Sequence, residues 1–215
     1  MSQETKQDAS FSSCPTFWSF DLETGGQPED GSHSKIFAVG RAWKSPITGH
    51  VEKKRFVLPF NRDDITPGCW KNFWSKPENL KALEILEASP KVTIKEVIAD
   101  LDECDAVTLK ETGLVMLPLT DTPSFDAHLL NVAFEKVGRK PIHFTSSGSF
   151  RPVMDIGSAV AMFMWRKFGY DGKFWFGDSI KESLHVQYEG VHDHLPENDA
   201  ENNLNKAHVL LQCQV

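Results

Sequence analysis

The sequence predicts a single α/β domain in which strands come first and helices pack between and after them. Two observations support this prediction. Up to residue 60 the chain contains three short runs rich in aromatic and β-branched residues, and most of the remainder has apolar residues at helical spacing. With 215 residues, 40% of them hydrophobic, the chain can bury a substantial core. We expect residues 17–215 to form one domain and the small, polar residues 1–16 to form a flexible tail.

Three strands are expected early in the chain. Residues 16–23 (TFWSFDLE) form an aromatic run that ends in acids, as expected of a buried strand whose tip faces a site. Residues 35–44 and 50–60 read as two more strands, joined by a turn that contains Pro and Gly. Together they predict an antiparallel meander at the start of a mixed sheet. A fourth strand is expected around 114–119, and a fifth strand with its loop over 142–148.

Helical spacing recurs in five later segments. Pro77 occupies a position favoured at helix starts, and Thr93 with Glu96 matches a capping box. Ser124 and Asp155 are placed to cap the helices that follow them. The five segments are 65–90, 93–104, 124–138, 156–169 and 198–214. Helices should therefore flank the sheet.

Cysteine usage and hydropathy suggest a soluble intracellular protein, in the cytoplasm or in the nucleoid or nucleus. The four cysteines stand far apart with no CxxC pair, which argues for free thiols rather than a disulfide scaffold or a zinc knuckle. The N-terminus lacks the basic start and apolar run of a secretory signal. No segment approaches the roughly 18 apolar residues that a membrane-spanning helix needs.

Four carboxylates and a histidine stand where they can form one site. Asp21 and Glu23 alternate in a strand, so their side chains share a face. Asp126 and Asp199 each fall on the first turn of a predicted helix, and His194 lies five positions before Asp199. Divalent cations such as Mg²⁺ prefer oxygen ligands, and a pair of ions about 3.5–4 Å apart suits phosphoryl transfer. Each motif alone is weak, since an acid at a strand end or a helix start is often only solvated.

Together these motifs resemble the DEDDh exonucleases, the ribonuclease H-like 3′→5′ exonucleases named after four acids and a histidine. The resemblance covers residues 16 to 214. The matching residues are Asp21, Glu23, Thr24 and Gly25 in the first motif, Ser124, Phe125 and Asp126 in the second, and His194, Asp199 and Ala200 in the third. The middle segment, ITPGCWKNFW, looks most like the phage exonuclease A (DexA) branch. One departure is Gly25, because many relatives have TTG where this chain has TGG.

The resemblance implies a ribonuclease H-like fold and a hydrolase that releases mononucleotides from a free 3′ end. It implies that Asp21, Glu23, Asp126 and Asp199 bind two Mg²⁺ or Mn²⁺ ions, and that His194 deprotonates the attacking water. A neutral imidazole suits that role near pH 7. The residues expected to contact substrate are Leu22, Thr24, Gly25, Phe125 and Trp74.

The expected partner is the 3′ end of single-stranded DNA or RNA. The phage-like middle segment favours DNA, and an exoribonuclease of the same family is the alternative. A catalytically silent nucleic-acid-binding domain is a third reading, which the presence of all five site residues disfavours. The formal charge of −7 argues against a protein that coats nucleic acid, although acids gathered in a metal site account for part of it. The oligomeric state stays open, with a homodimer as one option.

Several positions allow more than one interpretation. His192 competes with His194, but only His194 has an Asp-Ala pair five positions later. Zinc binding by HDH (192–194) lacks further Cys or His ligands nearby. Trp70, Phe73 and Trp74 can stack on bases or form a core stripe, and the core is favoured. The basic run 53–55 can touch phosphates, but a solvated strand face is favoured.

Overall fold

The computed structural model of the protein describes residues 16–168 and 193–212. The predicted tail therefore lies outside the described residues apart from Thr16, and so do His192, Cys14 and Cys213. Cys69 and Cys104 are free thiols, as expected.

The core of the protein is a five-stranded mixed sheet in the order β3-β2-β1-β4-β5. The first three strands form the predicted antiparallel meander, and β4 and β5 extend it in parallel with β1. The strands are β1 (Phe17–Thr24), β2 (Ile36–Lys44), β3 (Val51–Val57), β4 (Leu117–Thr120) and β5 (Met154–Asp155).

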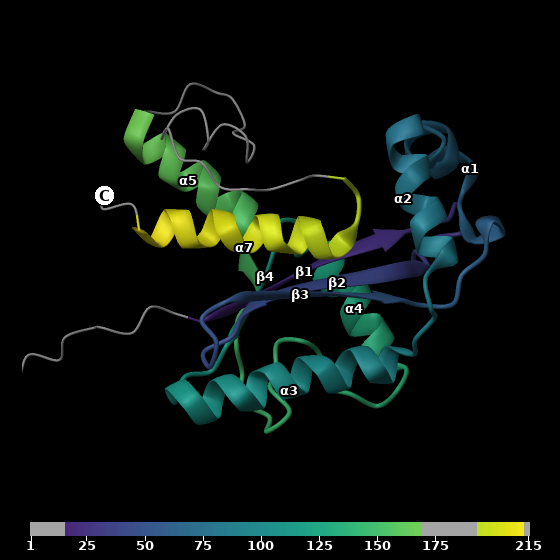
Figure 1. Ribbon diagram of the computed structural model, residues 1–215. Coiled ribbons are helices and arrows are strands. Elements are labelled where there is room, and N and C mark those ends of the chain that lie inside the picture. The colour runs from purple at the N-terminus through teal and green to yellow at the C-terminus, as the bar shows by residue number, and fades with distance from the viewer. Residues whose placement is uncertain (1–15, 169–192, 213–215) are drawn as a thin grey trace, which may run out of the picture.

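Helices cover both faces of the sheet (Figure 1). One face carries α5 (Ile156–Phe168) and α7 (Pro196–Gln212), and the other carries α3 (Ile94–Thr112) and α4 (Asp126–Glu135). A helical insert lies at the end of the sheet toward which β1 points (Figure 1). It consists of η1 (Arg62–Asp64), α1 (Pro67–Cys69), the π-helical turn η2 (Trp70–Trp74) and α2 (Pro77–Ala88). The predicted α/β architecture is confirmed.

Side-chain alternation along β1 separates the core from the acids. Trp18, Phe20 and Leu22 enter the hydrophobic core that includes residues of α3 and α4. Asp21 and Glu23 have the opposite parity, so they point to the face covered by α7. The same strand thus anchors the sheet and presents two carboxylates at its C-terminal end.

Several helix ends follow the sequence signals. Thr93 and Glu96 form the expected capping box of α3. The helix runs beyond the expected end at residue 104 and is closed by Gly113 in the left-handed conformation. Pro77 is the first residue of α2. Asp155 accepts a hydrogen bond of 2.9 Å from the backbone N–H of Ser158, as a cap should.

Two local predictions are wrong. Ser124 does not cap α4; the Asp126 amide donates instead to the carbonyl of Thr122 at 2.8 Å. The expected strand at 142–148 is a turn region with an isolated bridge between Phe144 and Phe150. The fifth strand is the two-residue β5, which is too short to show a periodicity in the sequence.

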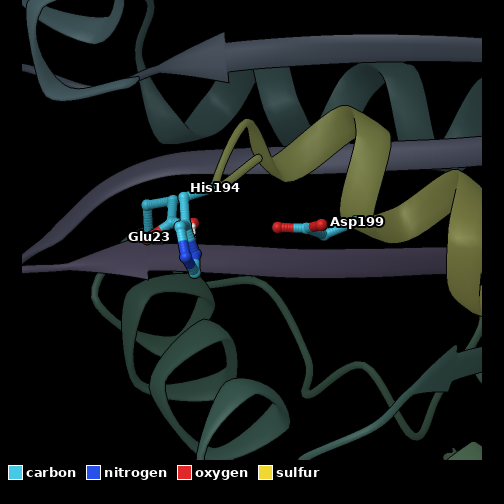
Figure 2. Close-up of side chains that lie close together, drawn as sticks. All are labelled: Glu23, His194 and Asp199. Carbon is cyan, nitrogen blue, oxygen red and sulfur yellow. Dashed lines mark ion pairs between the residues drawn. The ribbon is translucent and has the colours of Figure 1, made fainter. Parts of the chain in front are cut away.

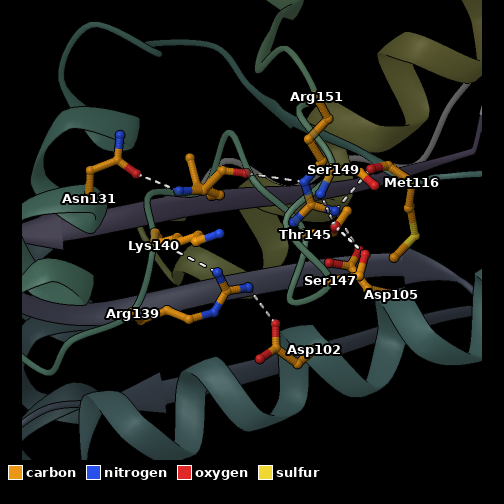
Figure 3. A network of polar contacts seen from close by, with 11 residues as sticks. Asp102, Asp105, Met116, Asn131, Arg139, Lys140, Thr145, Ser147, Ser149 and Arg151 are labelled. Atoms are coloured by element: carbon orange, nitrogen blue, oxygen red, sulfur yellow. Dashed lines mark hydrogen bonds and ion pairs between the residues drawn. The ribbon is translucent and has the colours of Figure 1, made fainter.

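The irregular segment before β5 is held by a buried arginine (Figure 3). Arg151 is 3% exposed and contacts an Asp105 carboxylate oxygen at 2.6 Å. It also donates to the carbonyls of Met116, at 3.0 Å, and Ile142, at 3.1 Å. These bonds join α3, the chain before β4 and the 142–151 segment, and so replace the strand pairing that the segment lacks.

We expect Arg151→Met to lower the free energy of unfolding by about 3–5 kcal/mol, because it leaves the Asp105 carboxylate buried without its partner. Burial already raises the pKa of Asp105, and Arg151 opposes that shift. Urea unfolding measures the loss. The double variant Arg151→Met/Asp105→Leu should recover much of it, since neither charge remains. A loss below about 1 kcal/mol for the single variant would contradict this account.

Candidate active site

The site begins with the two acids of β1. Glu23 is 6% exposed and Asp21 is partly buried, and both point to the α7 face. The pairing between β1 and β2 becomes irregular between Glu23 and Thr24, directly after these acids. The strand therefore ends at the site rather than passing through it.

Asp126 comes from the first residue of α4 and has a fixed orientation. The hydroxyls of Thr120 and Thr122 donate to one carboxylate oxygen, Oδ2, at 2.7 and 2.6 Å. Thr120 is the last residue of β4, which runs parallel to β1, so the ends of both strands meet at one edge of the sheet. Asp126 is 3% exposed. The two threonine bonds therefore fix the Asp126 carboxylate beside the acids of β1.

Asp199 and His194 reach the site from the other layer. Asp199 lies in the first turn of α7 and is buried. His194 adopts a left-handed backbone conformation (φ 58°), and its Nδ1 lies 3.9 Å from a Glu23 carboxylate oxygen. Its ring makes an edge-to-face contact with Phe73 of η2 at a centroid distance of 4.7 Å. Figure 2 shows Asp199 directed from α7 toward the Glu23–His194 pair.

These side chains form two groups of possible metal ligands. In each group the ligand atoms all lie within 4.8 Å of one another. The first, here called the His194 half, consists of Glu23, His194 and Asp199, and the second, the Asp126 half, consists of Asp21, Asp121 and Asp126. Asp21 and Glu23, two positions apart on β1, link the halves. All five predicted residues are brought together.

Asp121 is a member of the Asp126 half that the sequence motifs did not identify. It is exposed and directly follows Thr120, at the end of β4. A strand was predicted just before it, and the ends of neighbouring parallel strands meet at one edge of a sheet. The position of Asp121 directly after a predicted strand was therefore the sequence signal that could have identified it as a site residue. An acid at this edge joins the acids of β1.

The acids repel one another in the absence of a cation. Burial raises the pKa of Asp21 and Glu23 well above the usual range, and the neighbouring acids raise it further. Burial also raises the pKa of Asp126 to about 6, although the bonds from Thr122 and Thr120 oppose the shift. Oxygen donors with one imidazole suit a divalent ion such as Mg²⁺ or Mn²⁺. The donor set and its charge therefore fit a metal site.

We expect the metal-free protein to lose stability as the pH rises. With a pKa of about 6 instead of 3.8, native Asp126 holds its proton to higher pH than the unfolded chain does. Between about pH 4 and pH 6 the native state binds more protons, so its stability falls as the pH rises through that window. Keeping Asp126 ionised at neutral pH costs on the order of 3 kcal/mol.

The measurement is the melting temperature in excess chelator at pH 5 and pH 7.5, for the wild type and Asp126→Asn. The wild type should lose more stability over this range than the variant, which has no carboxylate to ionise. Adding Mn²⁺ should raise the wild-type melting temperature more at pH 7.5 than at pH 5. Equal losses by the two proteins would show that Asp126 is not the group responsible.

The helical insert supports the loop after β1. The Trp74 indole Nε1 donates to the Thr24 carbonyl at 2.9 Å, and the Thr66 amide donates to the Gly25 carbonyl at 2.9 Å. A Cβ on Gly25 would lie 2.2 Å from the Asp64 carbonyl oxygen. Only glycine fits there, which gives a steric reason for TGG in place of TTG. Glycine in place of the threonine found in many relatives is therefore explained by the close approach of the insert's backbone at Asp64.

The residues predicted to contact substrate occupy different environments. Phe125 is 37% exposed, beside Asp126, whereas Thr24 is 9% exposed and Gly25 is buried. The Leu22 side chain belongs to the core. Trp74 is completely buried, so its side chain supports the Thr24 carbonyl from behind and has no surface to offer a nucleotide. For Trp74 this corrects the prediction of a substrate contact. Of the three aromatics expected to form a core stripe, Trp74 is fully buried and Phe73 half-buried, whereas Trp70 is 36% exposed.

The basic run on β3 pairs with acids of the protein. Lys53 contacts Glu201 of α7 at 2.7 Å, and Lys54 contacts Asp100 at 2.6 Å. Arg55 lies 3.6 Å from Glu197 of α7. Lys53 and Lys54 are exposed, as expected of a solvated strand face, and their ion pairs with helix acids lie at the surface, whereas Arg55 is half-buried.

Comparison with known proteins shows which solved structures share the fold of this chain. No family model matches the chain, and neither does any curated protein. Solved structures do match. A product-bound exonuclease I is 14% identical with a TM-score of 0.56, covering 91% of this chain and 43% of that one. Cell-death related nuclease 4 (CRN-4) is 13% identical with a TM-score of 0.58, covering 92% and 64%. The nuclease domain of 3′hExo, a DEDDh family member bound to rAMP, is 15% identical with a TM-score of 0.53, covering 92% of both chains.

The chain has the ribonuclease H-like exonuclease fold. At this level of identity the similarity establishes the architecture, which agrees with the prediction from the three motifs. The chain spans less than two thirds of the length of exonuclease I and of CRN-4. No helix in the described part of the chain is long and apolar enough to cross a bilayer.

Proposed function

We propose that the protein is a metal-dependent 3′→5′ exonuclease that releases nucleoside monophosphates from single-stranded nucleic acid, with DNA favoured. The observation that supports this most strongly is the pair of ligand groups, one containing Asp21 and the other containing Glu23. Buried acids that repel one another at neutral pH favour a site built for cations. The fold shared with exonuclease I, CRN-4 and 3′hExo supports the same reaction class. Within that class, the middle segment still favours the phage exonuclease A branch.

Each residue has a role in this proposal. Glu23 and Asp199 hold one divalent ion and Asp21 with Asp126 a second, as Mg²⁺ or Mn²⁺. When bound, the ions supply the positive charge that stabilises the attacking and departing oxygens of an in-line displacement. His194 takes the proton from the attacking water. Thr120 and Thr122 keep the Asp126 carboxylate in place.

The substrate end contacts the loop after β1. The terminal nucleotide packs beside Thr24 and Gly25, whose backbone is held in place by bonds from the Trp74 indole and the Thr66 amide. Phe125 is exposed next to Asp126 and offers an aromatic face on which a base can stack. None of these contacts depends on base identity, which fits an enzyme that shortens strands of any sequence.

An exoribonuclease is the second candidate. The observation that favours it is the similarity to the 3′hExo nuclease domain, which was solved with rAMP. DNA and RNA of matched sequence, offered at equal concentrations, decide between the two candidates by their rates.

The proposal is tested by comparing a linear and a circular single strand of the same sequence in Mg²⁺ or Mn²⁺. An exonuclease degrades the linear strand and leaves the circle intact, because it needs a free end. A linear strand whose 3′ hydroxyl is blocked by a bulky group should also resist degradation, whereas a 5′ block should have no effect. Cleavage of the circle at a similar rate would indicate an endonuclease and overturn the proposed polarity.

A further inference from the structure

The first turn of α7 rests directly on β2. Ala38, Gly40 and Ala42 alternate along β2 and pair across from Glu23, Asp21 and Ser19 of β1, so they share the face that α7 covers. Gly40 is the smallest of the three and lies directly across from Asp21. The helix that carries Asp199 thus packs against the strand next to the site acids.

The contact at Gly40 leaves no room for a side chain. A Cβ at this position would lie 1.9 Å from the carbonyl carbon of Pro196, 2.0 Å from its oxygen and 2.3 Å from the amide nitrogen of Glu197. All three are backbone atoms, so a rotamer change cannot relieve the overlap. Any larger residue must push the first turn of α7 away from the sheet.

Two basic side chains of β3 hold the same turn. Arg55 is the cross-strand partner of Gly40 on β3, and its guanidinium lies 3.6 Å from the Glu197 carboxylate. Lys53 donates to Asn198 at 2.8 Å. Gly40 thus allows the first turn of α7 to approach β2 closely, and the contacts of Arg55 and Lys53 hold that turn in place.

Only one half of the site depends on this contact. In the His194 half, Asp199 lies three residues after Pro196 and His194 two residues before it. The Asp126 half is built from β1, the end of β4 and α4, and involves no residue of α7. A displacement of the first turn should therefore separate Asp199 and His194 from Glu23 while Asp21, Asp121 and Asp126 stay together.

We propose that Gly40, together with Arg55, is the positioning element of the His194 half: the bare backbone at Gly40 sets how closely α7 brings Asp199 and His194 to Glu23. The inference rests on the metal-binding role given to the site under the proposed function. It adds that a single methyl group at position 40, outside the set of metal ligands, can abolish ion binding in the His194 half while the Asp126 half still binds its ion.

The experiment compares the wild type, Gly40→Ala and Gly68→Ala. Gly68 is the matched control, because a Cβ there meets nothing within 4 Å. Bound Mn²⁺ is counted by titration with electron paramagnetic resonance, and kcat and KM are measured on a linear single strand. Gly40→Ala should bind one ion fewer than the wild type and lose about 100-fold in kcat with a smaller change in KM. Gly68→Ala should match the wild type in both readouts.

Ion binding by Gly40→Ala equal to that of the wild type in number and affinity would overturn the proposal, whatever happens to its rate. If Gly40→Ala does not fold, Arg55→Gln tests the same element without adding volume. It should weaken the binding of one ion about tenfold, and unchanged binding would overturn the proposal. A wild type that binds Mn²⁺ but cuts no nucleic acid would refute the proposed function alone, since the ion count still decides on Gly40.

Discussion

Replacing Asp21 with Asn abolishes nucleic-acid cleavage while making the metal-free protein more stable. Asp21 belongs to the Asp126 half and lies two positions from Glu23 of the His194 half. Removing its charge should therefore affect the binding of both ions, and we expect kcat to fall by about 10³-fold or more. Burial and the surrounding acids raise the pKa of Asp21, so the neutral amide relieves a repulsion that the native carboxylate suffers.

Opposite changes in activity and stability distinguish a functional acid from a structural one. The melting temperature in chelator should rise for Asp21→Asn and stay within about 1 °C for Asp63→Asn, an exposed acid in η1 that serves as the control. Activity should be lost only in the first variant. If Asp21→Asn were less stable than the wild type in chelator, the lost activity would reflect a damaged fold, and the assignment would fail.

Replacing His194 with Ala lowers kcat by about 10²–10⁴-fold and leaves the Asp126 half able to bind its ion. His194 touches Glu23 and Phe73, but it contributes no atom to the Asp126 half. The variant removes the proton acceptor and keeps the four acids. Added imidazole should restore part of the rate, because it supplies the missing base to the space left by the side chain.

His50→Ala is the control for this variant, since His50 is an exposed histidine beside the β2–β3 turn. It should show wild-type kcat and no response to imidazole. The result that speaks against the general-base role is a kcat for His194→Ala within about threefold of the wild type. A full rate at higher Mn²⁺ concentration would also speak against it and would make His194 a metal ligand alone.

The elements that carry the motifs were predictable from the sequence because their signals are local. Alternation along β1 places Asp21 and Glu23 on one face whatever packs on the other. The capping box at Thr93 and the start of α2 at Pro77 depend on neighbours three or four residues away. The resemblance of the three motifs to the DEDDh exonucleases is what predicted that Asp126, Asp199 and His194 join the β1 acids.

What the sequence did not reveal depends on contacts between distant segments. Gly25 and Gly40 each lie against backbone from another part of the chain, Asp64 and Pro196 respectively. No local pattern records such an approach. Asp121 joins the site because β4 pairs with β1. The sequence of β4 alone does not indicate which strand it pairs with. The segment at 142–148 has a strand-like composition, but buried bonds from Arg151 hold it as a turn.

The most direct test of the central claim uses 5′-labelled single-stranded DNA and RNA of matched sequence, with Mg²⁺ or Mn²⁺, and Asp21→Asn as the inactive control. The account predicts a ladder of labelled products that shortens from the 3′ end, accompanied by nucleoside monophosphates, with neither seen for the variant. Intact strands with both ions and both polymers would contradict it. An equal ladder from wild type and Asp21→Asn would contradict it as well, because the acids of β1 would then not perform the reaction.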